Sequence, residues 1–286
     1  MSTNPRTANA VQLIPGLTAG SDRQQLNAVS SSVHGKPNHQ IFRAGEIGRM
    51  HALAHQLSET GESERGLQVV DGWLDGQTGA GSKWVHLHFH AMLFEIDLGL
   101  LIEAQDRLLT YILPHAMSGR SAMTDGPAAM WWLQLASPDI MQLPWSHVAN
   151  NIEANIKATD SAFVHAHYLL ALGGTKNLGQ LEAWQSLNTT RTSTSILNGL
   201  ALTMSLFARS RFRGACDELE QWLPSILRLG GSSVQNDLFA RLHLYLDDRS
   251  AERESKLKLD TLGQAKRIFD LNAEIKDRTV DFAMTE

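Results

Sequence analysis

Apolar residues recur along most of this chain at the spacing that one face of an α-helix requires. After Glu46, the first set of such positions is Ile47, Met50, Ala54 and Leu57. Steps of three and four residues are typical of an amphipathic helix. Gly61 follows the set, as glycine often does at a helix C-terminus. The pattern therefore predicts a first helix between Glu46 and Gly61.

Segments of the same kind follow, separated by short breaks, and they group into pairs. The first helix is paired with a second at about residues 62–74, and a glycine-containing break at residues 76–81 precedes Ser82, a suitable N-cap. The later pairs are expected at residues 82–98 and 102–115, 124–136 and 144–158, 160–172 and 178–187, and 195–210 and 212–229.

The interval between these pairs is nearly even. Helix starts are expected near residues 46, 84, 124, 160, 195 and 232. Their spacing is roughly that of helix-pair repeats of the tetratricopeptide (TPR) kind, and no stretch alternates apolar and polar residues for the length of several strands. The predicted fold is all-α, a superhelical stack of antiparallel helix pairs that forms a TPR-like α-solenoid.

The two ends of the chain differ from the repeats. Residues 1–41 are rich in polar residues and glycine without a sustained helical period, which predicts an irregular arm. Residues 42–248 form the predicted repeat domain. Residues 249–286 are highly charged with an apolar stripe, which predicts a helix that caps the stack or dimerises. Any homo-oligomer is expected to form through these end segments.

Composition narrows the classes of function. The chain has 286 residues and a formal net charge of −5 without a block of Lys or Arg, so nucleic acid is not an expected partner. No segment approaches the roughly 18 apolar residues of a membrane span, and the N-terminus lacks the pattern of a signal peptide. The single cysteine, Cys216, suits a reducing compartment. We therefore expect a cytoplasmic protein that does not enter membranes.

Five local sequences occur together and in order as they do in the tetratricopeptide repeat protein 38 family. They are HALAH at residues 51–55, HLHFHAML at 86–93, WWLQL at 131–135, HAHY at 165–168 and GGSSVQNDLF at 230–239. The chain resembles this family over about residues 44–248. The resemblance implies a helical-repeat fold and a member shortened at its N-terminus, but it implies no particular reaction.

Four positions depart from the pattern of that family. Leu87 stands where the family tends to have Asn, Trp132 and Asn236 stand where it has Arg, and His165 stands where it has Asp. Two cations and two small polar groups are therefore missing. If the family site binds an anion, we expect this protein not to bind the same one.

Histidines are the main candidates for chemistry. The chain has twelve, and two pairs are four residues apart, which places each pair on one face of a helix. Such a pair can chelate one metal ion. The two pairs, named here the histidine quartet, are His51 and His55 with His86 and His90.

The members of the quartet share a helical phase, because each directly follows a residue of its apolar stripe. At ~100° per residue, His86 and His90 lie about 40° apart around the helix axis, whereas His88 lies roughly 160° from both. His167 has the same phase in its own helix. His88 and His165 do not, and they are expected to pack or to be exposed. The alternative is that all these histidines only pack, with ring nitrogens hydrogen-bonded nearby.

Weaker candidates lie, like the histidines, on the first helices of pairs, which line the inner, concave surface of TPR-type stacks. Trp131 or Trp132 could stack on a flat ligand, although adjacent helix residues diverge, so one is expected to pack in the core. Gln235 and Asp237 could bind a ligand, and Asp237 could orient a histidine or offset a helix dipole. The glycines at 230–231 could open an anion site or an ordinary capped turn.

These features lead to one main hypothesis and two alternatives. The main hypothesis is a His-lined inner pocket that binds a small molecule, in an enzyme of small-molecule metabolism. Its catalytic residues would be the histidine quartet and His167, acting through a divalent transition metal on the quartet or by acid–base transfer. The first alternative is a peptide-binding TPR-type scaffold without catalysis. The second is a purely structural or oligomerising protein, which would leave the histidines unexplained.

Overall fold

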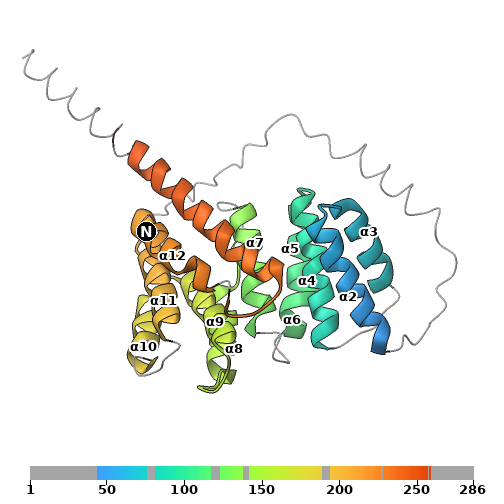
Figure 1. Cartoon of the computed structure of the whole chain (residues 1–286), viewed down its shortest axis with the longest axis horizontal. Helices are drawn as coiled ribbons and strands as arrows, with labels where there is room; N and C mark the ends of the chain where they lie inside the picture. Colours follow the sequence, from blue (N-terminus) through green and yellow to red (C-terminus); the bar gives the residue numbers. More distant parts are fainter. Residues whose placement is uncertain are drawn as a thin grey trace, which may run out of the picture. The chain divides into compact units, whose positions relative to one another are not determined.

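The computed structural model describes residues 44–75, 81–116, 123–137, 142–188, 194–226, 228–256 and 258. All of these belong to one compact unit, Phe42–Glu286. Within them every regular element is helical, which confirms the all-α prediction (Figure 1). No helix in this part of the chain is long and apolar enough to cross a bilayer. The predicted arm at residues 1–41 and most of the predicted tail lie outside the described residues.

The helices follow the predicted segments closely, with ends that differ by a few residues. The labelled elements are α2 (Ala44–Glu59), α3 (Ser63–Leu74), α4 (Ser82–Asp97), α5 (Leu101–Arg107), the π-helix η1 (Leu108–Ile112), α6 (Leu113–Ala116), α7 (Asp125–Ala136), α8 (Trp145–Asn155), α9 (Ala162–Thr175), α10 (Leu178–Asn188), α11 (Thr194–Ala208) and α12 (Phe212–Ile226). A last helix at residues 233–256 is called the C-terminal helix below.

The segment predicted as one helix at residues 102–115 is not regular. It consists of α5, the π-helix η1 and α6, and the backbone N–H of Leu113 bonds the carbonyl of Leu108, five residues back. Pro114 supplies the reason, because its ring clashes with the carbonyl four residues earlier in a regular α-helix. A single turn of π-helix just before Pro114 widens the backbone there.

The C-terminal helix crosses the boundary that was predicted at residues 248–249. It runs without a break from residue 233 to residue 256, and it contains neither glycine nor proline. The Ser250 hydroxyl donates to the Asp247 carbonyl within this helix. The increase in charged residues near residue 249 therefore changes the surface of one continuous helix and does not mark the start of another.

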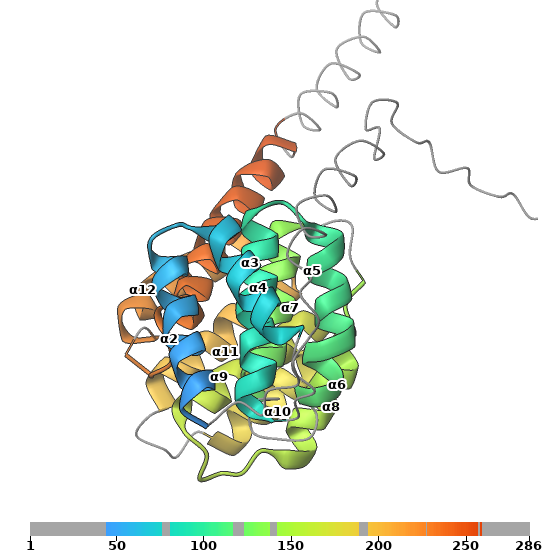
Figure 2. The same ribbon diagram turned by 90° about the vertical axis from the view of Figure 1, so that its right-hand side faces the viewer.

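Neighbouring helices in the sequence pack against one another, and so do the first helices of successive predicted pairs. The contacts of the second kind are α2 with α4, α4 with α7, α7 with α9, and α9 with α11. Figure 2 shows α2, α3 and α4 in front of the later helices. α4 also contacts α3, α5, η1 and α6, and its residues from Trp84 to Glu95 are buried except His86. Side chains from nearly every side of α4 therefore lie in the interior.

Glycines allow some of these helices to approach closely. A Cβ added at Gly174 of α9 would collide with the ring of Trp145 of α8, and one at Gly199 of α11 would collide with the indole of Trp222 of α12. Because interiors are close-packed, an alanine at either position would force the paired helices apart.

The C-terminal helix lies against three of the first helices. The Ser233 hydroxyl donates to Glu59 of α2 at 3.1 Å. Farther along, Phe239 packs on His167 of α9, and the guanidinium of Arg241 lies 4.5 Å from the ring centre of Trp132 on α7. Figure 1 shows this helix crossing α7. The faces that were predicted to line an inner groove are thus in contact with the chain's own last helix.

Candidate metal centre

The histidine quartet comes together in the structure. His51 and His55 extend from α2, and His86 and His90 extend from α4, which packs against α2. One ring nitrogen from each residue can be chosen so that all four atoms lie within 4.8 Å of one another. The expectation that the two helix pairs of histidines meet is confirmed.

The distances within the quartet are close to those of a metal site. The Nε2 atoms of His51 and His55 are 3.0 Å apart, and the ring centres in the quartet are separated by 4.4 to 6.4 Å. Metal–nitrogen bonds of about 2.0–2.1 Å would place tetrahedral ligand atoms roughly 3.3 Å apart. Only small side-chain movements would therefore bring the four nitrogens onto one ion.

His90 is the buried member of the quartet. Its side chain is only 1 % exposed, and neither ring nitrogen has a hydrogen-bond partner among the described residues. Leaving a buried polar group without a partner costs roughly 1–3 kcal/mol. His51, His55 and His86 are partly exposed, so part of the quartet is accessible to solvent.

Three members of the quartet are harder to protonate than a free histidine. Burial lowers the pKa of His51 to about 4, assisted by the neighbouring imidazoles of His86 and His55. Burial also lowers the pKa of His55 and holds the pKa of His90 well below its usual value, again with a contribution from the other imidazoles. Neutral rings keep one lone pair each, which is the form that a metal ion binds.

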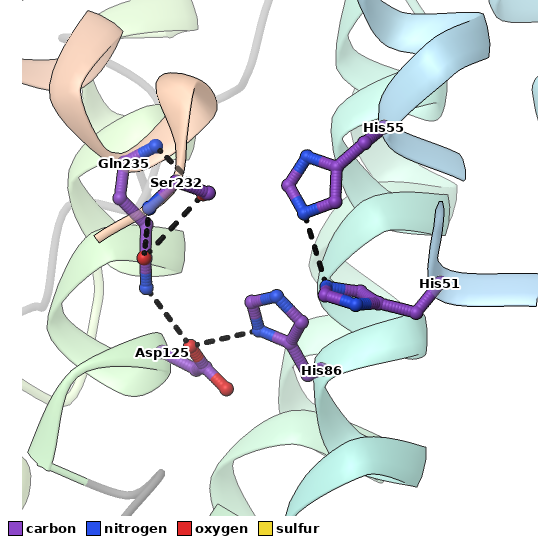
Figure 3. Close-up of polar contacts among 6 residues, drawn as sticks. All are labelled: His51, His55, His86, Asp125, Ser232 and Gln235. Atoms are coloured by element: carbon purple, nitrogen blue, oxygen red, sulfur yellow. Dashed lines mark hydrogen bonds and ion pairs between the residues drawn. The ribbon is translucent and has the colours of Figure 1, made fainter. Parts of the chain in front are cut away.

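A buried carboxylate contacts the quartet. Asp125, in the first turn of α7, is 2 % exposed, and its Oδ1 lies 3.1 Å from Nδ1 of His86. The same oxygen accepts a hydrogen bond of 3.3 Å from the side-chain amide of Gln235. Figure 3 shows Asp125 between His86 and Gln235, with the ring of His86 pointing toward it.

Gln235 belongs to a capping box at the start of the C-terminal helix. Its Oε1 accepts from the backbone N–H of Ser232 at 3.1 Å, and its own backbone N–H donates to the Ser232 hydroxyl at 3.4 Å (Figure 3). This is the reciprocal arrangement of an S-x-x-Q helix start. Two amides of this helix end therefore have partners within the chain, which favours the capped turn over an anion site.

Gly231, just before the box, has a backbone φ of +94°, which few residues other than glycine adopt. A Cβ at this position would also collide with the ring of Phe163. The glycine therefore allows the capping box to lie close to α9.

His167 does not join the quartet. It is fully buried, its Nδ1 bonds the Phe163 carbonyl at 2.9 Å, and its ring packs between those of Phe163 and Phe239. Burial lowers the pKa of His167, while the carbonyl and Asp125 act in the opposite direction. Its surroundings are those of a packing residue between α9 and the C-terminal helix.

The other predicted ligand residues have separate positions. Trp131 packs against Trp145 and Phe207 and donates its indole N–H to the Leu170 carbonyl. Trp132 is also buried, beneath Arg241. The expectation that one of the two tryptophans is in the core is met by Trp131.

Asp237 is exposed on the C-terminal helix, with no hydrogen bond or ion pair to the quartet in the described residues. Gln235 is the member of this group that is connected to the histidines.

The two off-phase histidines are buried. His165 packs near Trp184. His88 stacks on Tyr111 and belongs to a cluster around Arg107, named here the arginine cluster, whose members are Asp71, His88, Glu95 and Arg107. The guanidinium pairs with Glu95 at 2.6 and 2.9 Å and with Asp71 at 2.8 Å, and it donates to Nδ1 of His88 at 3.2 Å.

Sequence reasoning missed Asp125 and the arginine cluster. An acidic residue in the first turn of a helix usually offsets the helix dipole, so Asp125 carried no signal that it is buried. The sequence does contain one sign of the arginine cluster. His88 and Glu95 are seven residues apart, which places both on one stripe of a largely apolar helix. Two polar residues on one buried stripe require a partner, which Arg107 provides.

Comparison of the chain with protein-family models, with curated proteins and with solved structures finds no match. The site is therefore interpreted from its own geometry, and the resemblance to the tetratricopeptide repeat protein 38 family stays a prediction.

Proposed function

We propose that the histidine quartet binds one divalent transition metal and that this centre acts on a small molecule. The observation that carries the proposal is the convergence of four imidazoles, with candidate ligand atoms within 4.8 Å of one another, around a buried His90 that has no hydrogen-bond partner among the described residues. A bound ion would give His90 the partner that it lacks. Imidazole nitrogens suit zinc, copper, nickel and iron.

A metal centre is favoured over direct acid–base catalysis by the same histidines. An acid–base residue works best when its pKa is near the operating pH. The pKa of His51 is lowered to about 4, and those of His55 and His90 are also lowered. Rings that stay neutral are poor general acids at neutral pH, but they are ready ligands.

The partial exposure of three members of the quartet supports a reaction at the metal. Four imidazole ligands would leave the full charge of a divalent ion at the centre, and with a water as a fifth ligand such an ion would act as a Lewis acid and activate that water. Because His51, His55 and His86 are partly exposed, a small molecule can approach them, while His90 anchors the site from the interior. A metal-dependent enzyme of small-molecule metabolism is the function that fits best.

The scaffold of this centre is, in our proposal, a TPR-like stack of antiparallel helix pairs, as the resemblance implies. The contacts between the first helices of successive pairs support it, since α2, α4, α7, α9 and α11 contact one another in that order. The peptide-binding alternative is less favoured. The C-terminal helix contacts α2, α7 and α9, and it occupies the face on which a peptide would lie.

Metal analysis of the untagged full chain tests the function. We expect one equivalent of a transition metal after purification, or uptake of one equivalent of Co²⁺ by the metal-free protein. The variant His55→Ala/His90→Ala should bind Co²⁺ at least 100-fold more weakly. The matched control is His147→Ala, which removes an exposed histidine of α8 and should bind as the wild type does.

Equal Co²⁺ binding by the wild type and the double variant, or no binding by the wild type, would remove the metal centre and the function built on it.

A further inference from the structure

One continuous chain of hydrogen bonds joins the start of the C-terminal helix to the quartet. It passes from the Ser232 backbone N–H to Oε1 of Gln235, from Nε2 of Gln235 to Oδ1 of Asp125, and from that oxygen to Nδ1 of His86. The links measure 3.1, 3.3 and 3.1 Å. Figure 3 shows all three links in one view.

The direction of every link is fixed by chemistry. A backbone N–H can only donate, so it must face the carbonyl oxygen of Gln235. The amide NH₂ of Gln235 then faces Asp125, and an ionised carboxylate can only accept. Nδ1 of His86 must therefore carry the proton, which leaves the lone pair of that ring on Nε2.

From this chain we infer that Asp125 is a positioning residue of the metal centre, and that Gln235 holds it in place. Asp125 keeps His86 in the one tautomer whose Nε2 can bind an ion. The inference rests on the proposed metal function. In metal sites, a carboxylate that accepts from the second nitrogen of a ligand histidine fixes the ring and increases its basicity.

The burial of Asp125 and its place in the fold add to the argument. The side chain of Asp125 is only 3 % exposed. Its negative charge opposes the lowering of the pKa at both His51 and His167, so its field extends over the quartet and beyond. A buried anion beside a divalent ion offsets part of that ion's charge, which makes ion binding more favourable.

The main test is Co²⁺ titration of the full chain with the variant Asp125→Asn. An asparagine has the same shape but no negative charge, so it makes a weaker bond to His86 and no longer offsets the charge of the ion. We expect Co²⁺ affinity to fall by about 10- to 100-fold and the visible bands of bound Co²⁺ to shift. The wild type should also show one hyperfine-shifted ring N–H that exchanges slowly, and this proton should exchange faster in the variant.

Gln235→Leu and Ser232→Ala provide a matched pair. Gln235→Leu removes the donor to Asp125, and it should weaken Co²⁺ binding by roughly 3- to 10-fold, less than a loss of the carboxylate itself. Ser232→Ala removes the capping hydroxyl with its weak 3.4 Å contact to Oε1 of Gln235, and it keeps the shorter bond from the backbone N–H that orients Gln235. It should lower the melting temperature of the protein and leave the Co²⁺ affinity and spectrum unchanged.

The outcomes separate this inference from the metal function. If the wild type binds no Co²⁺, the proposed function fails. If the wild type binds Co²⁺ and Asp125→Asn has the same affinity and the same spectrum, Asp125 is only a packing residue and the inference is overturned. Should Asp125→Asn not fold, Gln235→Leu decides, because equal binding by Gln235→Leu and Ser232→Ala would also overturn it.

Discussion

Two sides of α4 carry polar clusters that differ in one respect. The histidine quartet uses His86 and His90, and the arginine cluster uses His88 and Glu95. In the arginine cluster the guanidinium contacts both carboxylates and a ring nitrogen of His88. In the quartet the shortest polar contact is between two imidazoles, and neither nitrogen of His90 has a hydrogen bond within the part of the chain that the structure describes.

The difference shows which cluster completes the fold and which leaves a place for a ligand. Buried polar groups in proteins are nearly always paired, and the arginine cluster follows that rule with groups from α3, α4 and α5. The quartet does not follow this rule, although two of its histidines lie on α4, a helix whose side chains are mostly buried. His88 and His90 are both buried, so burial alone does not separate the two roles of histidine on α4. A ring nitrogen of His88 is bonded to Arg107, whereas neither ring nitrogen of His90 has a partner among the described residues.

The largest effect should come from breaking the arginine cluster. Arg107→Met leaves the carboxylates of Glu95 and Asp71 without their partner in a largely buried place, which typically costs about 3–5 kcal/mol. Urea unfolding should therefore show a much lower midpoint, while the fraction that stays folded binds Co²⁺ as tightly as the wild type.

Arg209→Met is the matched control for this change, because it removes an arginine from an ion pair with Glu182 in which both side chains are well exposed. Arg209→Met should lower the free energy of unfolding by about 1 kcal/mol or less. If both variants lowered the free energy of unfolding by a similar amount, the arginine cluster would not stabilise the fold more than an exposed ion pair does.

A sharper comparison replaces one histidine on each side of α4. His88→Leu removes the acceptor of the Arg107 N–H, and the unpaired donor should cost about 1–3 kcal/mol, with metal binding kept. His90→Leu should abolish Co²⁺ binding and leave the metal-free protein as stable as the wild type or more so, because an unpaired imidazole becomes an apolar side chain.

Calorimetric melting without metal and Co²⁺ titration check both halves of this prediction. A His90→Leu protein that melts well below His88→Leu would contradict it, since His90 would then be the packing residue.

The smallest effect concerns pH. The pKa values of His51, His55 and His90 are lowered in the folded chain, chiefly by burial. The unfolded chain therefore takes up protons first, near pH 6.5, and stability that is present above this pH is lost as the pH falls toward about 4, the pKa of His51. The metal-free wild type should lose stability between pH 7.5 and 6.

Urea midpoints at the two pH values measure this loss. His90→Leu should lose less than the wild type, because one of the three groups is gone. An equal slope for the two proteins, or a rise in stability on acidification, would show that His90 does not titrate as described.

The helices and the quartet could be predicted from the sequence for the same reason. Both depend on local periodicity, and a four-residue spacing fixes the side of a helix whatever the rest of the chain does. The phase argument therefore grouped His86 with His90 and separated both from His88, as the structure does. It could not tell that His88 is buried, since that depends on Arg107 in a different helix.

The contacts of the C-terminal helix could not be predicted in this way. Its position against α2, α7 and α9 depends on tertiary packing. Gln235 was recognised as a candidate ligand residue from its helix, but its actual partner, Asp125, carries no local sign of burial. For the same reason the sequence predicts a ligand role for His167 and for one of the two tryptophans, whereas the structure buries both tryptophans and places Phe239 against His167 and Arg241 against Trp132.

The separation in sequence of these contacts has a consequence for the order of folding. The quartet lies within residues 51–90, whereas Asp125 and Gln235 are 110 residues apart. Contacts that are near in sequence form faster and close smaller loops than distant ones. We therefore expect the four imidazoles to assemble early, and the bond between Asp125 and Gln235 to form among the last. An ion could then bind the four imidazoles before the final helix holds Asp125 in place.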